Sequence, residues 1–431
     1  MSSLLTITPA KSLQGEISLP GDKSISHRAI ILASIARGIS VIRGWQKGKD
    51  CLATLSALKM MGVGVREEKD KLIIKGRGLT GLKEPTDILN CENSGTTMRL
   101  LAGLLSTQDF YSVLSGDSSL RRRPMRRVIS PLERMGAKIS GRENGQFPPL
   151  SIIGSNLKGI DYSLPIASAQ VKSCLLLAAL YARGTTSITE PYRSRDHTER
   201  MLKFLGVGLE IDSLTVKVEG GASLVGKEIS VPGDISAAAF FIGGGAIIKG
   251  SQVKILNVGL NPTRRGFIDV LLQMGADIRV LNLREECGEE LGDIEIKGGS
   301  TLKGILIRGE MIPRMIDEIP ILAVVACFAR GKTVIKDAAE LRVKETDRIK
   351  AIAAELCKMG AQIEEKRDGI IIEGTGRLKG CQCQSYKDHR IAMALIIAGL
   401  AARGKTEIVA SECIETSFPG FEDTLRKVVR D

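Results

Sequence analysis

The stretches "LPGDKSIS" (residues 19–26) and "VPGDISAA" (residues 231–238) repeat one phrase in two distant parts of the chain. Each places Pro-Gly-Asp, a turn-forming combination, between a β-rich stretch and an apolar helical one. A chain of 431 residues is long for a single core, so we expect two domains. We predict that the chain crosses between them at these phrases, which assigns 21–234 to one domain and 1–20 with 235–431 to the other. Pro-Gly-Asp also forms ordinary turns; the duplication of the whole phrase favours the crossing.

Two further phrases recur. In the first, an apolar run ends in a small or basic residue plus glycine before a β-rich stretch. Its copies begin at Ala33, Ala178, Gly243, Val325 and Ala398. In the second, a helical run ends in an apolar residue plus glycine before a strand. Its copies begin at Leu58, Leu132, Leu202, Leu271 and Leu356. This spacing of about 70–85 residues exceeds a solenoid unit of about 20–50 and predicts an α/β (α+β) unit of two helices and several strands, copied five or six times. Each glycine after a helix is predicted to be left-handed.

Composition limits the classes of function. The formal net charge of +12 is compatible with nucleic acid, an anionic membrane or small anionic substrates. Aromatic residues make up only 3% of the chain, which argues against stacking platforms for single strands, and no apolar run is long and uncharged enough to cross a bilayer. Many basic residues lie singly or in pairs in Gly/Ser/Thr-rich segments. We therefore expect small anions as ligands, with no nucleic-acid and no membrane partner.

The cysteines and the first residues bear on location. The nine cysteines are odd in number and scattered, which indicates reduced thiols in a cytoplasm. Cys381 and Cys383 form a C-x-C pair, but no second cysteine or histidine pair completes a zinc pattern, so we expect no metal. Residues 1–15 lack a basic leader followed by an apolar core. We therefore predict a cytoplasmic protein without a signal peptide.

Six predicted helices begin in segments that carry basic side chains, where the positive end of the helix dipole disfavours them. Lys23 and Arg28 belong to the first, whose cap is expected to be Ser24 or Ser26. The other starts carry Arg99; Gln170 and Lys172; Arg195 and His197; Lys344, Glu345 and Arg348; and Lys387, His389 and Arg390. One such start is compatible with a solvated helix end. Six are better explained by phosphate or carboxylate groups bound between the cations and the backbone N–H groups.

Two segments leave alternatives open. "SSLRRRPMRRVISPL", from Ser118, is either a disordered basic loop or nucleic-acid patch, or an ordered turn that points one or two arginines inward. Asp317, before the apolar helix "IPILAVVA", is either an N-cap or a general acid or base beside bound anions. We find no P-loop, dinucleotide fingerprint or nucleophile motif.

The signature segments together resemble the 3-phosphoshikimate 1-carboxyvinyltransferase (5-enolpyruvylshikimate-3-phosphate synthase) family of enolpyruvyl transferases. They are "LPGDKSISHRA" from Leu19, "NSGTTMR" from Asn93, "RRRPM" from Arg121, "SAQVKS" from Ser168, "DEIPILAV" from Asp317, "VKETDR" from Val343 and "DHRIAMA" from Asp388. They occur in the family's order. The resemblance implies a two-domain inside-out barrel, with three β-α-β-α-β-β repeats in each domain and a cleft between the domains.

The resemblance also implies a reaction and its site. Phosphoenolpyruvate would transfer its enolpyruvyl group to the 5-hydroxyl of 3-phosphoshikimate, with release of phosphate, by addition and elimination through a tetrahedral intermediate. The residues implied for 3-phosphoshikimate are Lys23, Ser24, Arg28, Ser168, Ala169, Gln170, Arg195, Asp317 and Lys344. Those implied for phosphoenolpyruvate are Lys23, Gly95, Arg123, Gln170, Arg348 and Arg390. Asp317, Glu345 and Lys23 would be catalytic.

Some positions depart from the family pattern. Ala169 stands where many members have a second serine, and Thr416 stands where some members have a lysine. The sister enzymes that use UDP-N-acetylglucosamine carry a cysteine in the loop before the Arg-Pro pair, whereas "GDSSLRRRPM" has none. The resemblance further implies a monomer of the shikimate pathway that needs no metal or organic cofactor, and a target of the inhibitor glyphosate.

Overall fold

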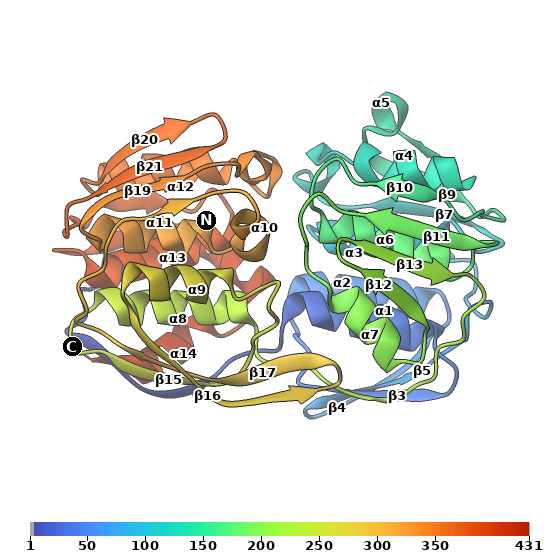
Figure 1. Cartoon of the computed structure of the whole chain (residues 1–431), viewed down its shortest axis with the longest axis horizontal. Helices are drawn as coiled ribbons and strands as arrows, with labels where there is room; N and C mark the ends of the chain where they lie inside the picture. The colour runs from blue at the N-terminus through green and yellow to red at the C-terminus, as the bar shows by residue number, and fades with distance from the viewer. Residues whose placement is uncertain (1–3, 431) are drawn as a thin grey trace. The chain divides into compact units, whose positions relative to one another are not determined.

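The computed structural model describes residues 4–430, which form two compact units (Figure 1). One unit, called the 21–231 unit below, consists of residues 21–231 together with the turn 286–289. The other, called the terminal unit, consists of the chain up to Pro20, residues 232–285 and residues from 290 onward. The chain passes from one unit to the other within each Pro-Gly-Asp phrase, between residues 20 and 21 and between residues 231 and 232.

The 21–231 unit contains three copies of a β-α-β-α-β-β repeat. The first copy is β14 (Glu228–Ser230), α1 (Lys23–Ile35), β3 (Ile39–Arg43), α2 (Lys49–Met60), β4 (Gly64–Glu68) and β5 (Lys71–Lys75). The second is β6 (Leu89–Asn90), α3 (Gly95–Leu105), β7 (Tyr111–Ser115), α4 (Arg126–Met135), β8 (Lys138–Gly141) and β9 (Phe147–Ile153), with the short η1 (Leu120–Arg122) and α5 (Arg142–Gly145). The third is β10 (Asp161–Ser163), α6 (Ala169–Ala179), β11 (Thr185–Thr189), α7 (His197–Phe204), β12 (Leu209–Asp212) and β13 (Thr215–Glu219).

The terminal unit repeats the plan. Its first copy is β2 (Ser12–Ser18), α8 (Ile235–Ile247), β15 (Gln252–Gly259), α9 (Gly266–Met274), β16 (Asp277–Glu286) and β17 (Glu289–Lys297). The second is β18 (Leu306–Ile307), α10 (Met311–Met315), α11 (Ile319–Phe328), β19 (Gly331–Ile335), η2 (Ala339–Val343), α12 (Arg348–Lys358), β20 (Gln362–Lys366) and β21 (Gly369–Gly374). The third is β22 (Gln382–Gln384), α13 (His389–Ala401), β23 (Thr406–Val409), η3 (Ser411–Thr416), α14 (Phe421–Val428) and β24 (Val429–Arg430), with β1 (Leu4–Ile7).

The six sheets share one topology. In each, the first two strands of the repeat are parallel and the helix between them makes the crossover; for example, β6 pairs with β7 and β10 with β11. The fourth strand then pairs antiparallel with the second, and the third strand lies outside it, as in the order β10-β11-β13-β12. The last repeat departs from this order: β1 takes the fourth position, in the order β22-β23-β1. Its β24 pairs instead with β2 at the edge of the sheet of the terminal unit's first repeat. The spacing of the glycine phrases therefore did mark copies of one α/β unit.

The first strand of each unit's first repeat comes from a distant part of the chain. The N-terminal β2 pairs with β15 in the terminal unit, while β14, which ends the 21–231 segment, pairs with β3. The chain thus leaves each strand through Pro-Gly-Asp and begins a helix of the other unit. This crossing brings two backbone segments close together: a Cβ on Gly21 would lie 1.8 Å from the carbonyl oxygen of Gly44, so only glycine fits there.

Each unit has its own core, built on three apolar helices. In the terminal unit these are α8, α11 and α13, which Figure 1 shows with strands around them, and nearly all of their residues are buried. In the 21–231 unit they are α1, α3 and α6. Helices that are apolar on every side must be covered on every side, which places the sheets outside. At Gly103 of α3, a Cβ would lie 2.2 Å from the carbonyl oxygen of Cys174 on α6.

The helix ends confirm the predicted glycines and correct one predicted cap. The five glycines of the second phrase, at positions 62, 136, 206, 275 and 360, all have positive φ, as predicted. The predicted cap of the first helix is wrong. Asp22 caps α1 by accepting a hydrogen bond from the Ile25 N–H at 2.9 Å, and Ser24 and Ser26 lie within the helix. Asp234 caps α8 in the second Pro-Gly-Asp phrase.

Candidate active site

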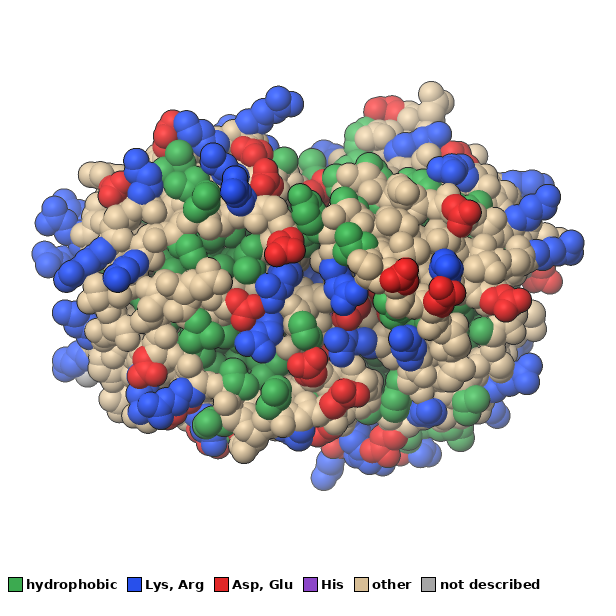
Figure 2. Space-filling view, viewed as in Figure 1, with side chains coloured by type: hydrophobic (Ala, Val, Ile, Leu, Met, Phe, Trp, Pro, Cys, Tyr) green, Lys and Arg blue, Asp and Glu red, His purple; other side chains and the backbone are tan. Residues whose placement is uncertain are grey.

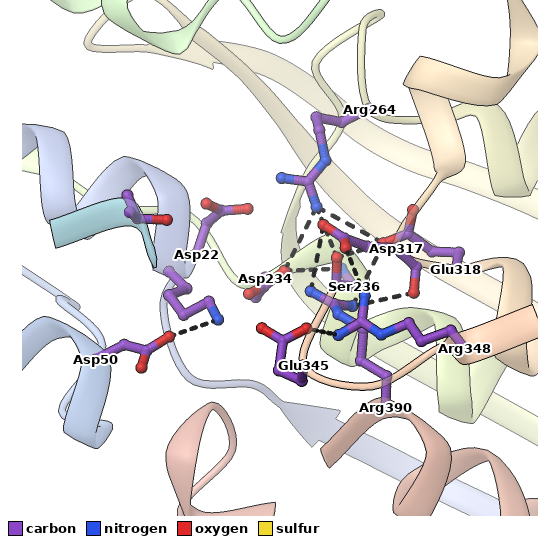
Figure 3. Close-up of polar contacts among 12 residues, drawn as sticks. Asp22, Asp50, Asp234, Ser236, Arg264, Asp317, Glu318, Glu345, Arg348 and Arg390 are labelled. Carbon is purple, nitrogen blue, oxygen red and sulfur yellow. Dashed lines mark hydrogen bonds and ion pairs between the residues drawn. The ribbon is translucent and has the colours of Figure 1, made fainter. Parts of the chain in front are cut away.

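Helix α1 begins with a lysine that has an acidic partner. Lys23 is the first residue of the helix, and its Nζ lies 2.9 Å from Oδ2 of Asp50, in the first turn of α2. The side chains are 15% and 8% exposed, so the pair is largely shielded from water. Asp50, drawn in Figure 3, offsets the repulsion between Lys23 and the positive end of the α1 dipole.

Arg28, one turn further along α1, is buried among neutral acceptors. Its guanidinium donates to the carbonyl oxygen of Ser24 at 2.9 Å, to Oγ1 of Thr198 at 2.6 Å and to Oγ of Ser173 at 2.7 Å. Burial lowers the pKa of Arg28 to about 10, so the side chain remains charged at neutral pH. These contacts join the start of α1 to α6 and α7.

The start of α3 leaves room for a close approach to the backbone. Gly95 is its first residue, and Ser94 caps it. A Cβ on Gly95 would lie 3.1 Å from an Nη of Arg99 and 3.4 Å from an Nη of Arg123. Arg123 is buried and donates to Oδ1 of Asn93 at 2.6 Å. The segment of five arginines therefore points Arg123 inward.

Gln170 connects α6 to α3. Its amide oxygen accepts a hydrogen bond from Arg99 at 2.5 Å, and its amide nitrogen donates to Oγ1 of Thr96 at 3.0 Å. Ser168 caps α6, and Ala169 beside it is half-exposed. Arg195, also half-buried, lies two residues before α7. Within the 21–231 unit, the predicted residues other than Arg123 thus lie near the starts of four helices that share hydrogen bonds, and Arg123 directly follows η1.

In the terminal unit, Arg348 binds three carboxylates. Its guanidinium lies 3.1 Å from Oδ1 of Asp317, 2.6 Å from Oε2 of Glu345 and 2.8 Å from Oδ2 of Asp388. Figure 3 shows Arg348 between Asp317 and Glu345. Burial alone would lower the pKa of Arg348, but Asp388, Glu345 and Asp317 outweigh it and the pKa is raised.

Arg390 and Arg264 extend this cluster. Arg390 lies 3.5 Å from Oδ2 of Asp317 and 3.8 Å from Oε1 of Glu318. Arg264 donates to the Ser236 hydroxyl at 2.7 Å, and that hydroxyl donates to Glu318. The N-cap of α11 is Glu318, whose side chain makes no capping bond. The alternative that Asp317 caps this helix is therefore wrong, because its carboxylate faces Arg348 and Arg390 (Figure 3).

Lys344 lies in the half-buried segment before α12. Burial lowers its pKa, Arg348 lowers it further, and Asp317 opposes both. The terminal unit therefore gathers carboxylates, arginines and a lysine with a lowered pKa at the starts of α11, α12 and α13. Such a set can bind anions and move protons at neutral pH.

The three histidines are buried, and two of them contact polar side chains. His27 Nδ1 lies 2.7 Å from Oγ1 of Thr54, and His197 Nδ1 lies 2.7 Å from Oε1 of Glu289. Burial, followed by Lys23 and Arg28, holds the pKa of His27 well below its usual range. Within residues 4–430, no three His, Cys, Asp or Glu side chains are arranged to hold a metal ion, and all nine cysteines are free.

Sequence reasoning missed the acidic partners of the cations. Asp50, Asp388 and Arg264 were not proposed, and Glu318, next to Asp317, was given no role. Asp388 carried a signal, because it stands directly before an apolar helix as Asp22 and Asp234 do. Asp50 carried none, because its partner lies in another helix.

Among the residues that the structure describes, the basic side chains on the surface are dispersed and form no continuous patch on the face shown (Figure 2). On the face drawn in Figure 2, basic side chains are scattered and interrupted by acidic and hydrophobic ones. In the part of the chain that the structure describes, no helix is long and apolar enough to cross a membrane.

Comparisons with known proteins cover nearly the whole chain. Residues 7–425 match the family described as EPSP synthase (3-phosphoshikimate 1-carboxyvinyltransferase). The 3-phosphoshikimate 1-carboxyvinyltransferases of Citrifermentans bemidjiense and Pelotomaculum thermopropionicum are 54% and 52% identical, over 99% of both chains in each case. A solved EPSP synthase from Acinetobacter baumannii superposes with a TM-score of 0.88 at 47% identity and covers 100% of this chain and 98% of its own.

Proposed function

This chain belongs to the EPSP synthase family and has its activity, the transfer of the enolpyruvyl group of phosphoenolpyruvate to 3-phosphoshikimate in the shikimate pathway, and we propose that the residues described above carry that reaction. The observation that supports the assignment best is the cluster of Asp317, Glu345, Arg348 and Arg390 at three helix starts of the terminal unit. It brings two carboxylates and two arginines together where the reaction needs proton transfer and anion binding.

We assign 3-phosphoshikimate chiefly to the 21–231 unit. Arg28 and Arg195 would bind its phosphate, with the Ser168 hydroxyl and the Ala169 backbone beside them. Ser24 and Gln170 would bind its ring hydroxyls. Lys23, whose Nζ already pairs with Asp50, would reach both substrates. Asp317 and Lys344 would meet the acceptor from the terminal unit, with Asp317 at the 5-hydroxyl.

Phosphoenolpyruvate would lie against Gly95, where the absent Cβ admits it to the backbone. Arg123, Arg348 and Arg390 would bind its phosphate and carboxylate, and Gln170 would contact it. Arg348 already binds three carboxylates. We propose that the bound anion displaces one of them, and this exchange would release Asp317 or Glu345 for proton transfer.

The reaction balances without a redox step. A proton adds to the methylene carbon of phosphoenolpyruvate, which makes its C2 electrophilic, and the 5-hydroxyl oxygen attacks C2 while Asp317 takes the hydroxyl proton. The tetrahedral intermediate then expels phosphate, and a proton leaves the methyl group to restore the double bond. Glu345, with Lys23, would carry the proton to and from the methylene carbon. Arginines placed at the phosphate stabilise its developing charge.

We further propose that the protein acts as a monomer in the cytoplasm and requires no metal or organic cofactor. The test of the function is phosphate release from phosphoenolpyruvate with each acceptor in turn. Release with 3-phosphoshikimate, unaffected by a chelator, is the expected result. Release with UDP-N-acetylglucosamine instead, or none with 3-phosphoshikimate, would overturn the assignment. Sedimentation at assay concentrations tests the monomer.

A further inference from the structure

A lysine buried in α6 of the 21–231 unit forms a triad with two carboxylates. The Lys172 Nζ lies 2.6 Å from Oε2 of Glu190 and 2.6 Å from Oε1 of Glu199, and the three side chains are 2%, 4% and 5% exposed. Burial would lower the pKa of Lys172, but Glu199 and Glu190 outweigh it and the pKa is raised. The triad, called the Lys172 triad below, therefore carries a buried ammonium between two acids.

The Lys172 triad holds the segment that carries Arg195. Glu190 directly follows β11, and its carboxylate accepts hydrogen bonds from the backbone N–H of Ser194, at 3.3 Å, and from the Ser194 hydroxyl. Lys172 donates to the carbonyl oxygen of Ser194 at 3.5 Å. Ser194 is the residue before Arg195. The loop 190–195 is thus closed around the buried charges, and the position of Arg195 depends on this closure.

The same triad lies beside the residues that hold Arg28. Ser173 follows Lys172 on α6, and Thr198 precedes Glu199 on α7. Their hydroxyl oxygens lie 2.7 Å apart, and both accept hydrogen bonds from Arg28. The ion pair from Lys172 to Glu199 therefore fixes the spacing of α6 and α7 at the point where these two acceptors meet the guanidinium.

The charges of the triad also suit two neighbouring arginines. Burial raises the pKa of Glu199, and Lys172 opposes that shift. With both carboxylates ionised, one ammonium and two carboxylates leave one negative charge. Arg195 lowers the pKa of Arg28, whereas Glu199 raises it. Glu199 thus offsets part of the repulsion between Arg28 and Arg195.

Stability alone does not explain such a triad. Replacing a buried ion pair with apolar side chains of similar volume is often neutral or stabilising. Burial of Lys172 has a desolvation cost that an apolar residue would avoid. What the triad supplies, and an apolar cluster would not, is a directional connection among α6, the loop 190–195 and α7.

We propose that Lys172, Glu190 and Glu199 are positioning residues that hold Arg28 and Arg195 at the spacing required by the phosphate of 3-phosphoshikimate. This inference rests on the proposed function. The three side chains contact no substrate; they act through Ser194, Thr198 and Ser173 on the two arginines. The phosphate then meets two guanidinium groups that are already oriented, so less freedom is lost on binding.

The test compares two ligands that differ by the phosphate, 3-phosphoshikimate and shikimate, by titration calorimetry. The variant Lys172→Met/Glu190→Gln/Glu199→Leu removes the charges and approximates the volumes. We expect its Kd for 3-phosphoshikimate to rise about 10–100-fold, as expected when charge-assisted hydrogen bonds lose their geometry. The Kd for shikimate and the KM for phosphoenolpyruvate should change less than threefold.

A milder variant covers the case in which the triple variant does not fold. Glu199→Gln is nearly isosteric and leaves the pair of Lys172 and Glu190 in place. It should raise the Kd for 3-phosphoshikimate about 3–10-fold, again without a matching change for shikimate.

A matched control is Glu355→Gln in the terminal unit. Glu355 is a buried carboxylate that also ties three segments, since it accepts from Lys358 at 2.7 Å, from Tyr386 at 2.7 Å and from the Gln384 N–H at 3.0 Å. It should lower the melting temperature and leave the ratio of the two Kd values unchanged.

The outcomes separate the two proposals. A wild-type protein that binds 3-phosphoshikimate no more tightly than shikimate would refute the assigned phosphate site itself. A wild-type protein with the expected preference, together with a folded variant that keeps it, would refute only the positioning role. An equal loss of affinity for both ligands would likewise show that the triad is merely structural.

Discussion

Replacing Asp388 with asparagine tests how the terminal unit tolerates its buried arginine. Asp388 has no exposed surface, and Arg348 is buried beside it at 2.8 Å. Removing one partner of a buried ion pair costs about 3–5 kcal/mol. Here Arg348 keeps Glu345 and Asp317, so we expect the free energy of unfolding of the terminal unit to fall by about 2–3 kcal/mol. For a unit of this size, that loss corresponds to a melting temperature lower by about 4–12 °C.

The asparagine variant removes the charge and keeps the cap. Asp388 also caps α13 by accepting from the Arg390 N–H at 2.9 Å, and an asparagine oxygen can take that role. Asp388→Ala removes both, so it should cost about 1 kcal/mol more. Asp347→Asn is the control: Asp347 caps α12 and pairs with Arg342, but its side chain is 31% exposed, so the loss should stay below about 1 kcal/mol.

Two probes locate the effect. Trp45 is the only tryptophan, and it is buried in the 21–231 unit, so its fluorescence reports the unfolding of that unit. Far-ultraviolet circular dichroism in urea reports both units. We expect the dichroism to show an earlier transition in Asp388→Asn, with the Trp45 midpoint nearly unchanged. A variant within about 0.5 kcal/mol of the wild type would refute the reasoning, since it would show that the other two carboxylates suffice.

Three further predictions concern the proposed site. Asp317→Asn should bind 3-phosphoshikimate in calorimetry but lose about 10²–10⁴ in turnover, as expected for a missing general base; near-wild-type turnover would contradict the role. The wild type should be inhibited by glyphosate. Gly95→Ala should raise the inhibition constant more than the KM for phosphoenolpyruvate, because the added methyl group, 3.1 Å from Arg99 and 3.4 Å from Arg123, should hinder the longer inhibitor more than the compact substrate. Equal changes in the inhibition constant and the KM would count against the assignment of Gly95 to the phosphoenolpyruvate site. Because burial lowers the pKa of Lys344, its ammonium loses the proton at a lower pH than an exposed lysine, and affinity for 3-phosphoshikimate should decline on the alkaline side. Lys344→Met should bind weakly at neutral pH and lack that decline; an identical profile would exclude Lys344 as its cause.

The repeated unit could be predicted because its signals are local. A helix that ends in Met-Gly or Leu-Gly before a strand can be recognised from eight consecutive residues, wherever it lies in the fold. The strand exchange could not be predicted from spacing alone. The residues of Ser12–Ser18 and Glu228–Ser230 do not indicate their partner strands. The pairings of β2 with β15 and of β14 with β3 depend on contacts between segments far apart in the chain.

The same difference between local signals and distant contacts explains which site residues could be predicted. Basic side chains near helix starts are visible in the sequence, because the turn and the apolar run define the start. Their partners are not, since Lys23 pairs with Asp50 and Arg348 with Asp388 across different helices. Lys172 shows the limit best: the sequence places this lysine in the first turn of a helix, but gives no sign of the two buried carboxylates that contact it.

Arg28 and Arg348 show why these partners decide what an arginine can do. Both are buried in their own units, but Arg28 donates to two hydroxyls and a carbonyl, whereas Arg348 binds three carboxylates. The pKa of Arg28 is accordingly lowered and that of Arg348 raised. The acceptors that contact Arg28 are neutral and supply no counter-charge. A phosphate that reaches Arg28 would supply one, and this ion pair favours binding of the phosphate. An anion that reaches Arg348 instead competes with three carboxylates that already bind it. Under the proposed assignments, the first arrangement suits a group that only binds, and the second suits a step in which Asp317 or Glu345 must be released to accept a proton.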